Sequence, residues 1–431
     1  MSSPTVQAYC EAFEARAEAL PGAQLAWLSG LRRDAIGAFA ERGFPTTRWE
    51  DWRTTNVTPI SERTFPLAEA ASATPSSTST LTRLDDAHRL VFVDGHLAPE
   101  LSNPGSLPKG ARVCGLAEAL DAVPERVEQV LGRSGDSKTD PFRALNTAFF
   151  ADGLFLDLEP GVELERPVHA LFLSSGSETL ASPRVVIGLR ENSRASVVEQ
   201  YAALDGGVYL TNAVTDVSLD RGAALEHMKL QNESTDAFHI AALAADQEAG
   251  SRLGSYSISI GGRLSRFDIH TRLGAEQSSC KLVGLYLGRD AQLVDHHTWI
   301  DHAAPLTTSR ELYKGILDHK ARGVFCGHVH VRPDAQDIDA KQSNRNLMLS
   351  DEASVHAQPQ LEIYADDVKC SHGNAIGQLD ENALFYLRSR GIPLAAARSM
   401  LTWAFANEIL AELPIAALRK DLEPFVHGWL R

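Results

Sequence analysis

The chain has 431 residues, of which 44% are hydrophobic and 23% are charged. These values indicate an ordinary globular protein with a large core and room for two or three domains. The formal net charge of -15 argues against nucleic acid or an anionic membrane as a partner, because both bind to concentrated basic surfaces.

The cysteines and the N-terminus indicate the cellular compartment. The five cysteines are widely spaced and include no Cys-x-x-Cys pair, which fits neither a disulfide framework nor a tetrathiolate metal site. The N-terminal segment has neither the apolar core of a secretory signal nor the character of a transit peptide. No apolar run approaches the roughly 18 residues of a membrane span. We therefore expect a cytoplasmic protein, in which free thiols can take part in transient metal or sulfur chemistry.

Residues 1–140 are predicted to form an N-terminal helical and mixed domain. Apolar residues at helical spacing predict two helices before Gly43. Residues 68–82 are rich in Ser, Thr and Ala and predict a flexible connection. The run from Leu90 to Gly95 predicts a strand and turn, and the run from Leu116 to Leu131 predicts a helix.

Residues 141–377 lose the helical period and consist of short extended runs separated by similar turns. Examples are ENSRAS around Ala195 and DRGAAL around Ala223. Such a loose repeat implies stacked turns and favours a right-handed parallel β-helix. The spacing of the turns is irregular, so some intervals must contain two strands. We expect the flanking helical regions to cap the ends of the stack.

The clearest predicted strand is SRFDIHTRLG, in which apolar and polar residues alternate. Alternation with a period of two places one set of side chains inside the β-helix and the other set outside. The predicted inner residues are Phe267, Ile269, Thr271 and Leu273, and the predicted outer residues are Arg266, Asp268, His270 and Arg272.

Residues 378–431 are predicted to form a C-terminal helical domain. Asp380 is a suitable N-cap, Gly391 is a suitable left-handed stop, and Pro393 suits the first turn of the next helix. That next helix has an apolar face that requires a partner surface. The residues of this face are Leu394, Ala397, Leu401, Phe405 and Ile409.

Cys370 and His372 are the most informative pair of residues in the chain. They lie two positions apart in a predicted strand, so both side chains point to the same face as Val368. A sulfur and an imidazole on one face can bind iron or zinc, or can pass sulfur along. The alternative is a packed thiol beside a histidine with only a structural role. The spacing alone leaves both interpretations open.

A second candidate metal site lies in the segment GVFCGHVHV. Cys326, His328 and His330 occupy alternate positions and share one strand face. Three such residues on a straight strand span roughly 13 Å, so they cannot all bind one ion unless the strand bends.

The segment VDHHTWIDHAAP is rich in potential ligands and suggests a metal-binding loop. The favoured interpretation is a hydrogen-bonded turn or a polar ladder on the wall of the β-helix. The residues concerned are Asp295, His296, His297, Asp301 and His302.

Two segments, SNRNLMLSDEASVHAQPQLEIYADDVKCSHG and LFYLRSRGI, resemble the C-terminal signature of the SufB/SufD family of scaffold proteins for iron-sulfur cluster assembly. The resemblance extends from roughly Glu199 to Glu408. SufB members carry a sulfur-accepting cysteine in a segment of the type R-N-Y-T-Q-C-D. The corresponding stretch here, QSNRNLMLSDEA, contains no cysteine, so the chain is similar to the SufD side of the family.

The resemblance implies a non-catalytic scaffold subunit of the SUF system. In this family the SufD side pairs with SufB through the β-helices in a SufBCD complex, and the ATPase SufC docks on the C-terminal helices. The chain has no Walker A pattern, so ATP hydrolysis would belong to the partner. The residues that match the entry motif for SufC are Leu384, Phe385, Tyr386, Leu387, Arg388 and Arg390.

The same resemblance implies a role for the Cys370 and His372 pair. His372 matches the family histidine that forms the site of nascent cluster assembly together with the acceptor cysteine of SufB, and Cys370 would support it. The cluster would be transient, with no permanently bound cofactor. The sequence leaves open the type of cluster and the binding of reduced flavin. It also leaves open whether the isolated chain forms a homodimer through the β-helix edge that pairs with SufB.

An alternative function is that of a carbohydrate-active β-helix enzyme, either a polysaccharide lyase or a hydrolase. Such enzymes need clustered carboxylates or a bound Ca²⁺ with a basic residue in an outer groove. Asp366, Asp367 and Lys369 are the candidates for that role. The missing secretory signal and the acidic composition argue against a polyanionic substrate.

Overall fold

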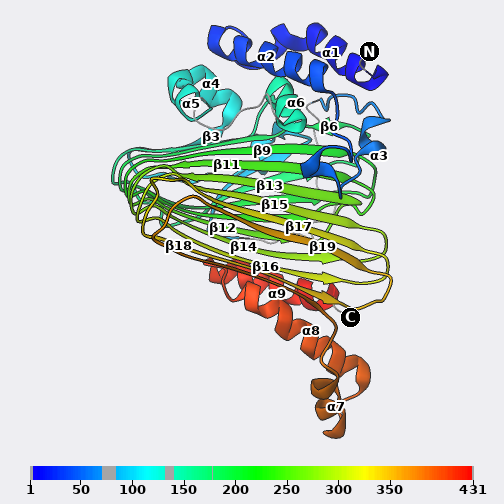
Figure 1. Cartoon of the computed structure of the whole chain (residues 1–431). Coiled ribbons are helices and arrows are strands. Elements are labelled where there is room, and N and C mark those ends of the chain that lie inside the picture. The colour runs from blue at the N-terminus through cyan, green and yellow to red at the C-terminus, as the bar shows by residue number, and fades with distance from the viewer. Residues whose placement is uncertain (1–2, 70–83, 132–139, 177, 430–431) are drawn as a thin grey trace.

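The core of the protein is a parallel β-solenoid of about eight turns, so the chain is mainly β, as predicted. The computed structural model describes residues 3–69, 84–131, 140–176 and 178–429. The flexible connection expected at residues 68–82 lies almost wholly outside the described residues. Successive strands of the solenoid alternate between two sheets that face each other (Figure 1).

The first sheet, which we call the β20 sheet after its last strand, contains ten strands. All neighbouring strands are parallel except for the pair formed by β1 and β2. In spatial order the strands are β2 (His96–Leu97), β1 (His88–Val93), β5 (Val168–Ser174), β8 (Arg194–Ala203), β10 (Ala224–Asn232), β12 (Arg252–Ser259), β14 (Ser279–Gly288), β16 (Thr308–Leu317), β18 (Ile338–Met348) and β20 (Val368–Gly377).

The second sheet, the β19 sheet, faces the first and also ends at the last turn. Strand β6 (Leu180–Ala181) pairs with β9 at its side. In spatial order the strands are β19 (Ser354–Ile363), β17 (Arg322–Val331), β15 (Leu293–His302), β13 (Leu264–Leu273), β11 (Phe238–Gln247), β9 (Leu210–Leu219), β7 (Arg184–Leu189), β4 (Leu154–Leu158) and β3 (Ala111–Gly115).

The two-sheet arrangement explains the irregular spacing of the turns in the sequence. One full turn of the solenoid separates Leu293 from its partner Arg322, and that interval also contains a strand of the other sheet. Asn192, Asp290 and His319 adopt positive φ angles in the connections between strands. Asn and Asp tolerate this conformation better than most residues, so such turns need no glycine.

The interior of the solenoid is packed with apolar side chains. Phe267, Ile269 and Leu273 are buried there, which confirms the inner face predicted for β13. Arg266 is on the predicted outer face, yet it is buried as well, because Trp52 of the N-terminal region covers it. The outer wall of the β19 sheet is therefore partly covered by the N-terminal region.

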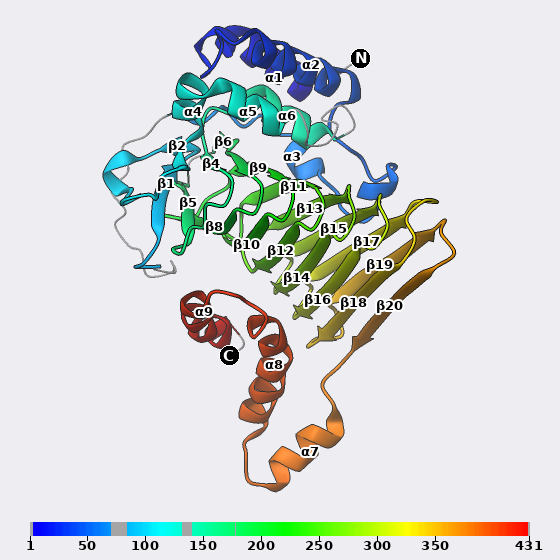
Figure 2. The ribbon, with the colours of Figure 1, turned by 90° about the vertical axis from the view of Figure 1, so that its left-hand side faces the viewer.

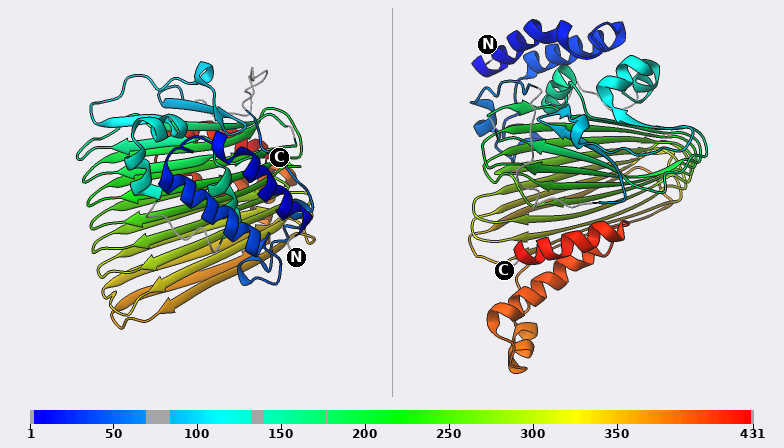
Figure 3. Two further views of the ribbon diagram at one scale, coloured as in Figure 1. Left: turned by 90° about the horizontal axis from the view of Figure 1, so that it is seen from above. Right: turned by 180° about the vertical axis from the view of Figure 1, so that it is seen from behind.

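Helix α6 packs on the outer wall of the β19 sheet, and helices α1 and α2 lie outside α6 (Figures 1 and 3). The Ser3 side chain caps the first helix by accepting a hydrogen bond from the Val6 amide. The single helix expected between Leu116 and Leu131 is instead two helices, because Pro124 begins a second helix after Val123. The helical segments are α1 (Pro4–Arg16), η1 (Ala17–Ala19), α2 (Ala26–Arg42), η2 (Glu50–Trp52), α3 (Thr58–Ser61), η3 (Pro99–Leu101), α4 (Leu116–Ala122), α5 (Pro124–Leu131) and α6 (Pro141–Phe149).

The C-terminal helices are α7 (Glu381–Ser389), α8 (Leu394–Leu410) and α9 (Ala416–Trp429). The Asp380 side chain accepts hydrogen bonds from two amides of α7, and Gly391 has a φ of 84°, as predicted. Pro393 is the N-cap of α8 and not a residue of its first turn. The buried residues of α8 are Ala397, Thr402, Ala406, Ile409 and Leu410, so the expected face is only partly correct.

The expectation that the flanking helices cap both ends of the stack is wrong for the C-terminal helices. Helices α8 and α9 pack on the outer wall of the β20 sheet, beside Leu285 and Ile316. The outward side chains of the β20 sheet are apolar beneath these helices, so packing on the wall buries the apolar faces of α8 and α9. As a result, strands β19 and β20 form an end of the solenoid that no described helix covers (Figure 2). No helix among the described residues is long and apolar enough to cross a membrane.

Candidate functional site

Cys370 and His372 lie on β20 and face the inside of the last turn. In the parallel register Cys370 is opposite Ala340, and His372 is opposite Gln342. Ala340 belongs to the solenoid core, and Gln342 is buried, so this column of side chains points inward. Because the stack ends at β20, His372 is exposed and Cys370 is only half-buried. The two residues share one face, as the sequence predicts.

The thiol of Cys370 is poorly suited to act as a nucleophile. Burial raises its pKa, the charge of Asp339 raises it further, and a backbone hydrogen bond with Ala340 opposes both effects. A thiol with a raised pKa stays protonated at neutral pH, whereas the thiolate is the form that attacks sulfur or binds metal. His372 presents an exposed imidazole beside this thiol.

A polar column continues from His372 into the solenoid. The Gln342 side-chain amide donates a hydrogen bond of 2.6 Å to the Glu311 carboxylate on the next strand. Burial raises the pKa of Glu311 to about 7. Asn344 and Asn374 form the neighbouring column. The inner face at the open end thus carries several polar side chains beside the apolar Ala340.

Large apolar side chains surround the open end. Ile363, Tyr364 and Ile376 are all exposed, and Ile376 has 51% of its surface accessible. Strand β20 pairs with β18 along one edge, and no other described strand pairs with its opposite edge. A free strand edge with apolar side chains beside it is a surface on which another chain can add a strand.

The expected docking motif for SufC lies on α7. Leu384 is buried, whereas Phe385 and Tyr386 are 75% and 57% exposed. Arg390 lies over the ring of Tyr386, with its guanidinium carbon 5.1 Å from the ring centroid. Leu387 is half-buried and Arg388 is exposed. Helix α7 extends away from the solenoid (Figure 2), so this aromatic and basic surface faces outward.

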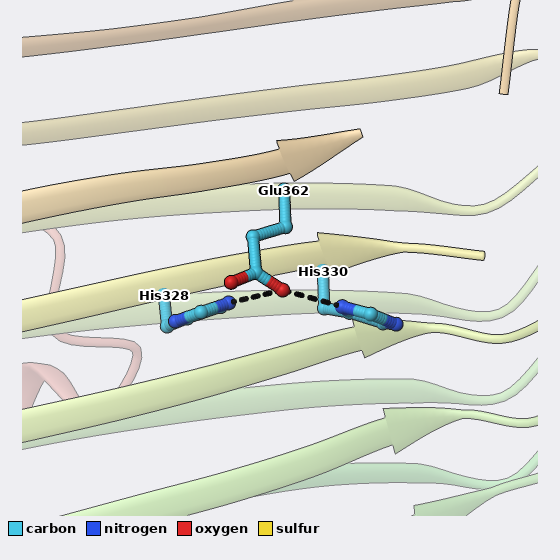
Figure 4. Close-up of side chains that lie close together, drawn as sticks. All are labelled: His328, His330 and Glu362. Carbon is cyan, nitrogen blue, oxygen red and sulfur yellow. Dashed lines mark hydrogen bonds and ion pairs between the residues drawn. The ribbon is translucent and has the colours of Figure 1, made fainter. Parts of the chain in front are cut away.

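The outer wall of the β19 sheet brings His328 and His330 together with Glu362 (Figure 4). The carboxylate oxygen Oε2 of Glu362 lies 3.3 Å from Nε2 of His328 and 3.2 Å from Nδ1 of His330. Cys326 does not join this group, because it hydrogen-bonds the His297 ring. Glu362 is opposite His330 on the next turn, and only the register of the strands reveals that position.

The Asp and His residues of β15 are divided between the two sides of the wall. Asp295 faces outward and accepts from Arg266 at 2.9 Å and from His297 at 3.1 Å. His296 and His302 face inward, where His302 bonds to two hydroxyl groups of Thr307 and Ser309. The segment is therefore a strand with polar ladders and not a metal-binding loop.

A charged cluster inside the solenoid was missed by the sequence analysis. The Glu199 carboxylate is fully buried and lies 2.9 Å from Nε2 of His227. Lys229 is buried beside it, with its ammonium group 3.6 Å from the centre of the Tyr201 ring. These residues occupy inward positions of the neighbouring strands β8 and β10. The only sign of them in the sequence is a charged residue at a position where the period-two pattern expects an apolar one. All five cysteines lie among the described residues, and none forms a disulfide.

Comparison with known proteins gives a consistent assignment. Residues 172–405 match the SufBD core domain of the SUF system for iron-sulfur cluster assembly, and residues 3–170 match the SufBD protein N-terminal region. An iron-sulfur cluster assembly SufBD family protein of Synechocystis is 33% identical over 411 residues, which cover 93% of this chain and 90% of the relative.

The iron-sulfur cluster assembly proteins named SufD from two bacteria are also similar. The SufD protein of Escherichia coli is 30% identical over 388 residues, which cover 88% of each chain. The SufD protein of Bacillus subtilis is 26% identical over 410 residues, which cover 92% of each chain. These matches extend over the solenoid and both flanking regions. The chain belongs to the SufBD family of iron-sulfur cluster assembly proteins.

Proposed function

We propose that the chain is the SufD-type scaffold subunit of a SUF complex. It pairs with a SufB chain through the last turn of the solenoid and binds the ATPase SufC through α7 and α8. It hydrolyses no ATP itself and contributes His372 to a cluster assembly site at the interface with SufB. The observation that supports this proposal most directly is the uncovered last turn, which presents an inward-facing histidine at a free strand edge.

Strand addition explains how two such chains recognise each other. The free edge of β20 offers backbone donors and acceptors that a strand of the partner satisfies, and Ile376 adds apolar contact area. The polar inner face formed by His372 and Asn374 then becomes enclosed between two solenoids. An enclosed site protects an unfinished cluster from water and from oxidants.

The chemistry of the site follows from the two side chains. The neutral imidazole of His372 is a suitable ligand for iron, which is cargo of the complex and not its permanent cofactor. Cys370 is a poor sulfur acceptor, because its pKa is raised by burial. The thiolate therefore comes from the SufB chain, and Cys370 packs beside the site.

The carbohydrate-active alternative has no further support. Asp366, Asp367 and Lys369 are exposed at and just after the turn that precedes β20. The family assignment accounts for the β-solenoid without an enzymatic reaction on polysaccharide.

The proposal is tested by expressing the chain together with SufB and SufC. The His372→Ala variant is expected to form the complex in normal yield, as judged by size-exclusion chromatography. After anaerobic reconstitution with iron and sulfide, it is expected to lack most of the visible absorption of the cluster. The His319→Ala variant is the matched control, because His319 is an exposed histidine in a turn of the solenoid.

Two results would contradict the proposal. If His372→Ala assembles as much cluster as the unchanged chain, the histidine is not a ligand. If the variant loses SufB but His319→Ala keeps it, His372 is a structural contact and not part of the assembly site.

A further inference from the structure

The outer wall of the β19 sheet carries a second group of metal-binding side chains, away from the last-turn site. His328 and His330 of β17 and Glu362 of β19 form this group, which we call the outer-wall triad. One ligand atom from each residue lies within 4.8 Å of the other two. The triad faces outward from the β19 sheet, whereas His372 faces the interior from the β20 sheet. The two groups are therefore separate.

The distances within the triad suit a metal ion. Bonds of about 2.1 Å in a tetrahedral site separate neighbouring ligand atoms by about 3.4 Å. The carboxylate oxygen of Glu362 lies 3.3 Å from Nε2 of His328 and 3.2 Å from Nδ1 of His330. Glu362 is the most exposed of the three residues, so its side chain can turn to place the carboxylate oxygen around one ion with the two ring nitrogens.

The hydrogen bonding of the triad without metal is incomplete. Nδ1 of His330 hydrogen-bonds Glu362. Nε2 of His328 is buried, and its contact with the Glu362 carboxylate, at 3.3 Å, is an ion pair outside the angular limits of a hydrogen bond. An ion between Nε2 and the carboxylate would give this buried nitrogen a well-directed partner.

Trp299 on the neighbouring strand holds the His328 ring in position. The two rings stack with centroids 3.9 Å apart and an angle of 18° between their planes. His270 contacts the other side of Trp299 in an edge-to-face arrangement. Metal-ligating histidines depend on such neighbours to fix the orientation of the ring. Trp299 is thus a positioning residue for the triad.

We propose that His328, His330 and Glu362 bind a single divalent transition-metal ion on the outer wall of the solenoid. Two imidazoles and one carboxylate are the donors that Zn²⁺ and Fe²⁺ accept readily. Three protein ligands leave at least one coordination position open to water or to a group from another molecule. The ion ties β17 to β19 and thereby stabilises the last turn. This inference does not rest on the proposed role of His372.

The test is a metal titration of the isolated full-length chain after removal of metal with a chelator. Calorimetry with Zn²⁺ and visible spectroscopy with Co²⁺ measure affinity and coordination. A double variant, Cys370→Ser with His372→Ala, removes the last-turn site from the measurement. This background is expected to bind one equivalent of either ion.

Three further variants in the same background identify the ligands. Glu362→Gln and His330→Gln are each expected to weaken binding at least about tenfold. His356→Gln is the matched control, because His356 lies on the same strand outside the triad and should leave the affinity unchanged. Circular dichroism checks that each variant folds. If one of the two triad variants does not fold, the metal affinity of the other still tests the site.

Trp299 supplies a separate optical signal. Co²⁺ bound to the triad is expected to quench the fluorescence of Trp299, which stacks on His328. The Trp299→Phe variant keeps an aromatic ring at this position, so it should retain the affinity but lose this quenching.

Three results would overturn the inference. One is that the double variant Cys370→Ser with His372→Ala binds no ion. Another is that Glu362→Gln in this background binds the ion as tightly as the double variant does. An equal loss of binding in His356→Gln would show that the ion is held elsewhere.

Discussion

Glu199 shows how a single ionised residue is accommodated inside the solenoid. Its carboxylate accepts hydrogen bonds from Tyr201, Thr215 and His227 at 2.7 to 2.9 Å. Burial alone raises the pKa of a carboxyl group, but the hydrogen bond and charge of His227 and the charge of Lys229 lower the pKa of Glu199 to about 2. The carboxylate is therefore charged at every physiological pH and holds its neighbours in place.

The Glu199→Gln variant should be less stable at neutral pH by about 3 kcal/mol, because it leaves the ammonium group of Lys229 buried without the carboxylate of Glu199. The pKa of Glu199 is lower in the folded chain than its ordinary value of 4.5. Its contribution is thus complete above pH 4.5 and is lost as the pH falls toward 2. Urea unfolding between pH 7 and pH 2.5 should show this loss in the unchanged chain only. The exposed Glu352→Gln is the control, and identical pH profiles would refute the assignment.

Single residues were predictable from the sequence only where one strand contains the whole pattern. Cys370 and His372 share a face because both lie on β20, and two-residue spacing is sufficient for that conclusion. Glu362 and Glu199 meet their partners across neighbouring turns of the solenoid, so the strand register decides which residues are partners. The sequence does not give this register unless the length of each turn is known.

At the scale of elements, the segment around η2 binds the outer wall through a polar network. The guanidinium of Arg266 stacks on Trp52, 3.7 Å from the ring centroid, and donates to the Asp51 carbonyl oxygen. The Thr55 hydroxyl donates to the Asp295 carboxylate at 2.5 Å. Trp52 is also buried in the apolar cluster of the N-terminal region, so this segment is held by packing as well as by the polar network.

The Asp295→Asn variant should loosen this contact and cost about 3 to 5 kcal/mol, because Arg266 remains buried and charged without its partner and His297 loses the carboxylate that keeps it protonated. Burial and the charge of Arg266 lower the pKa of His297, but the charge and hydrogen bond of Asp295 outweigh them and raise it to about 10. The contribution of the ionised pair is thus complete below about pH 6.5 and is lost as the pH rises through 10.

Hydrogen exchange of residues 44–60 measures this effect directly. At pH 7, these amides should exchange faster in Asp295→Asn than in the unchanged chain. In the unchanged chain, exchange corrected for the intrinsic rate should become faster when the pH is raised above 10. The Asp290→Asn variant in an exposed turn is the control. Equal protection in both variants would mean that the apolar cluster alone holds the segment.

Helix α7 gives the second prediction at this scale. Replacement of Phe385 and Tyr386 by alanine should weaken SufC binding at least about tenfold, because exposed aromatic residues commonly dominate such interfaces. Binding of purified SufC to the isolated chain measures the loss. Leu306→Ala is the control, since Leu306 is an exposed apolar residue in a turn of the solenoid. Unchanged SufC affinity in the double variant would place the docking surface elsewhere.

At the scale of the whole molecule, the sequence predicted the solenoid but not the positions of its helices. Repeated turns and period-two strands indicate stacking directly. The positions of α8 and α9 depend on the outward apolar side chains of the β20 sheet, such as Met228 and Leu285. In these strands both the inward and the outward side chains are apolar and buried. The sequence therefore lacks the alternation of polar and apolar residues that would tell the inner face from the outer face.

The uncovered last turn also affects the life of the chain before it meets a partner. A strand edge with free backbone groups beside Ile363 and Ile376 is a template for addition of any extended segment, including that of a second identical chain. An isolated chain therefore carries an edge that favours self-association and aggregation. On the proposed function, synthesis in balance with the partner subunit limits the time for which this edge stays exposed.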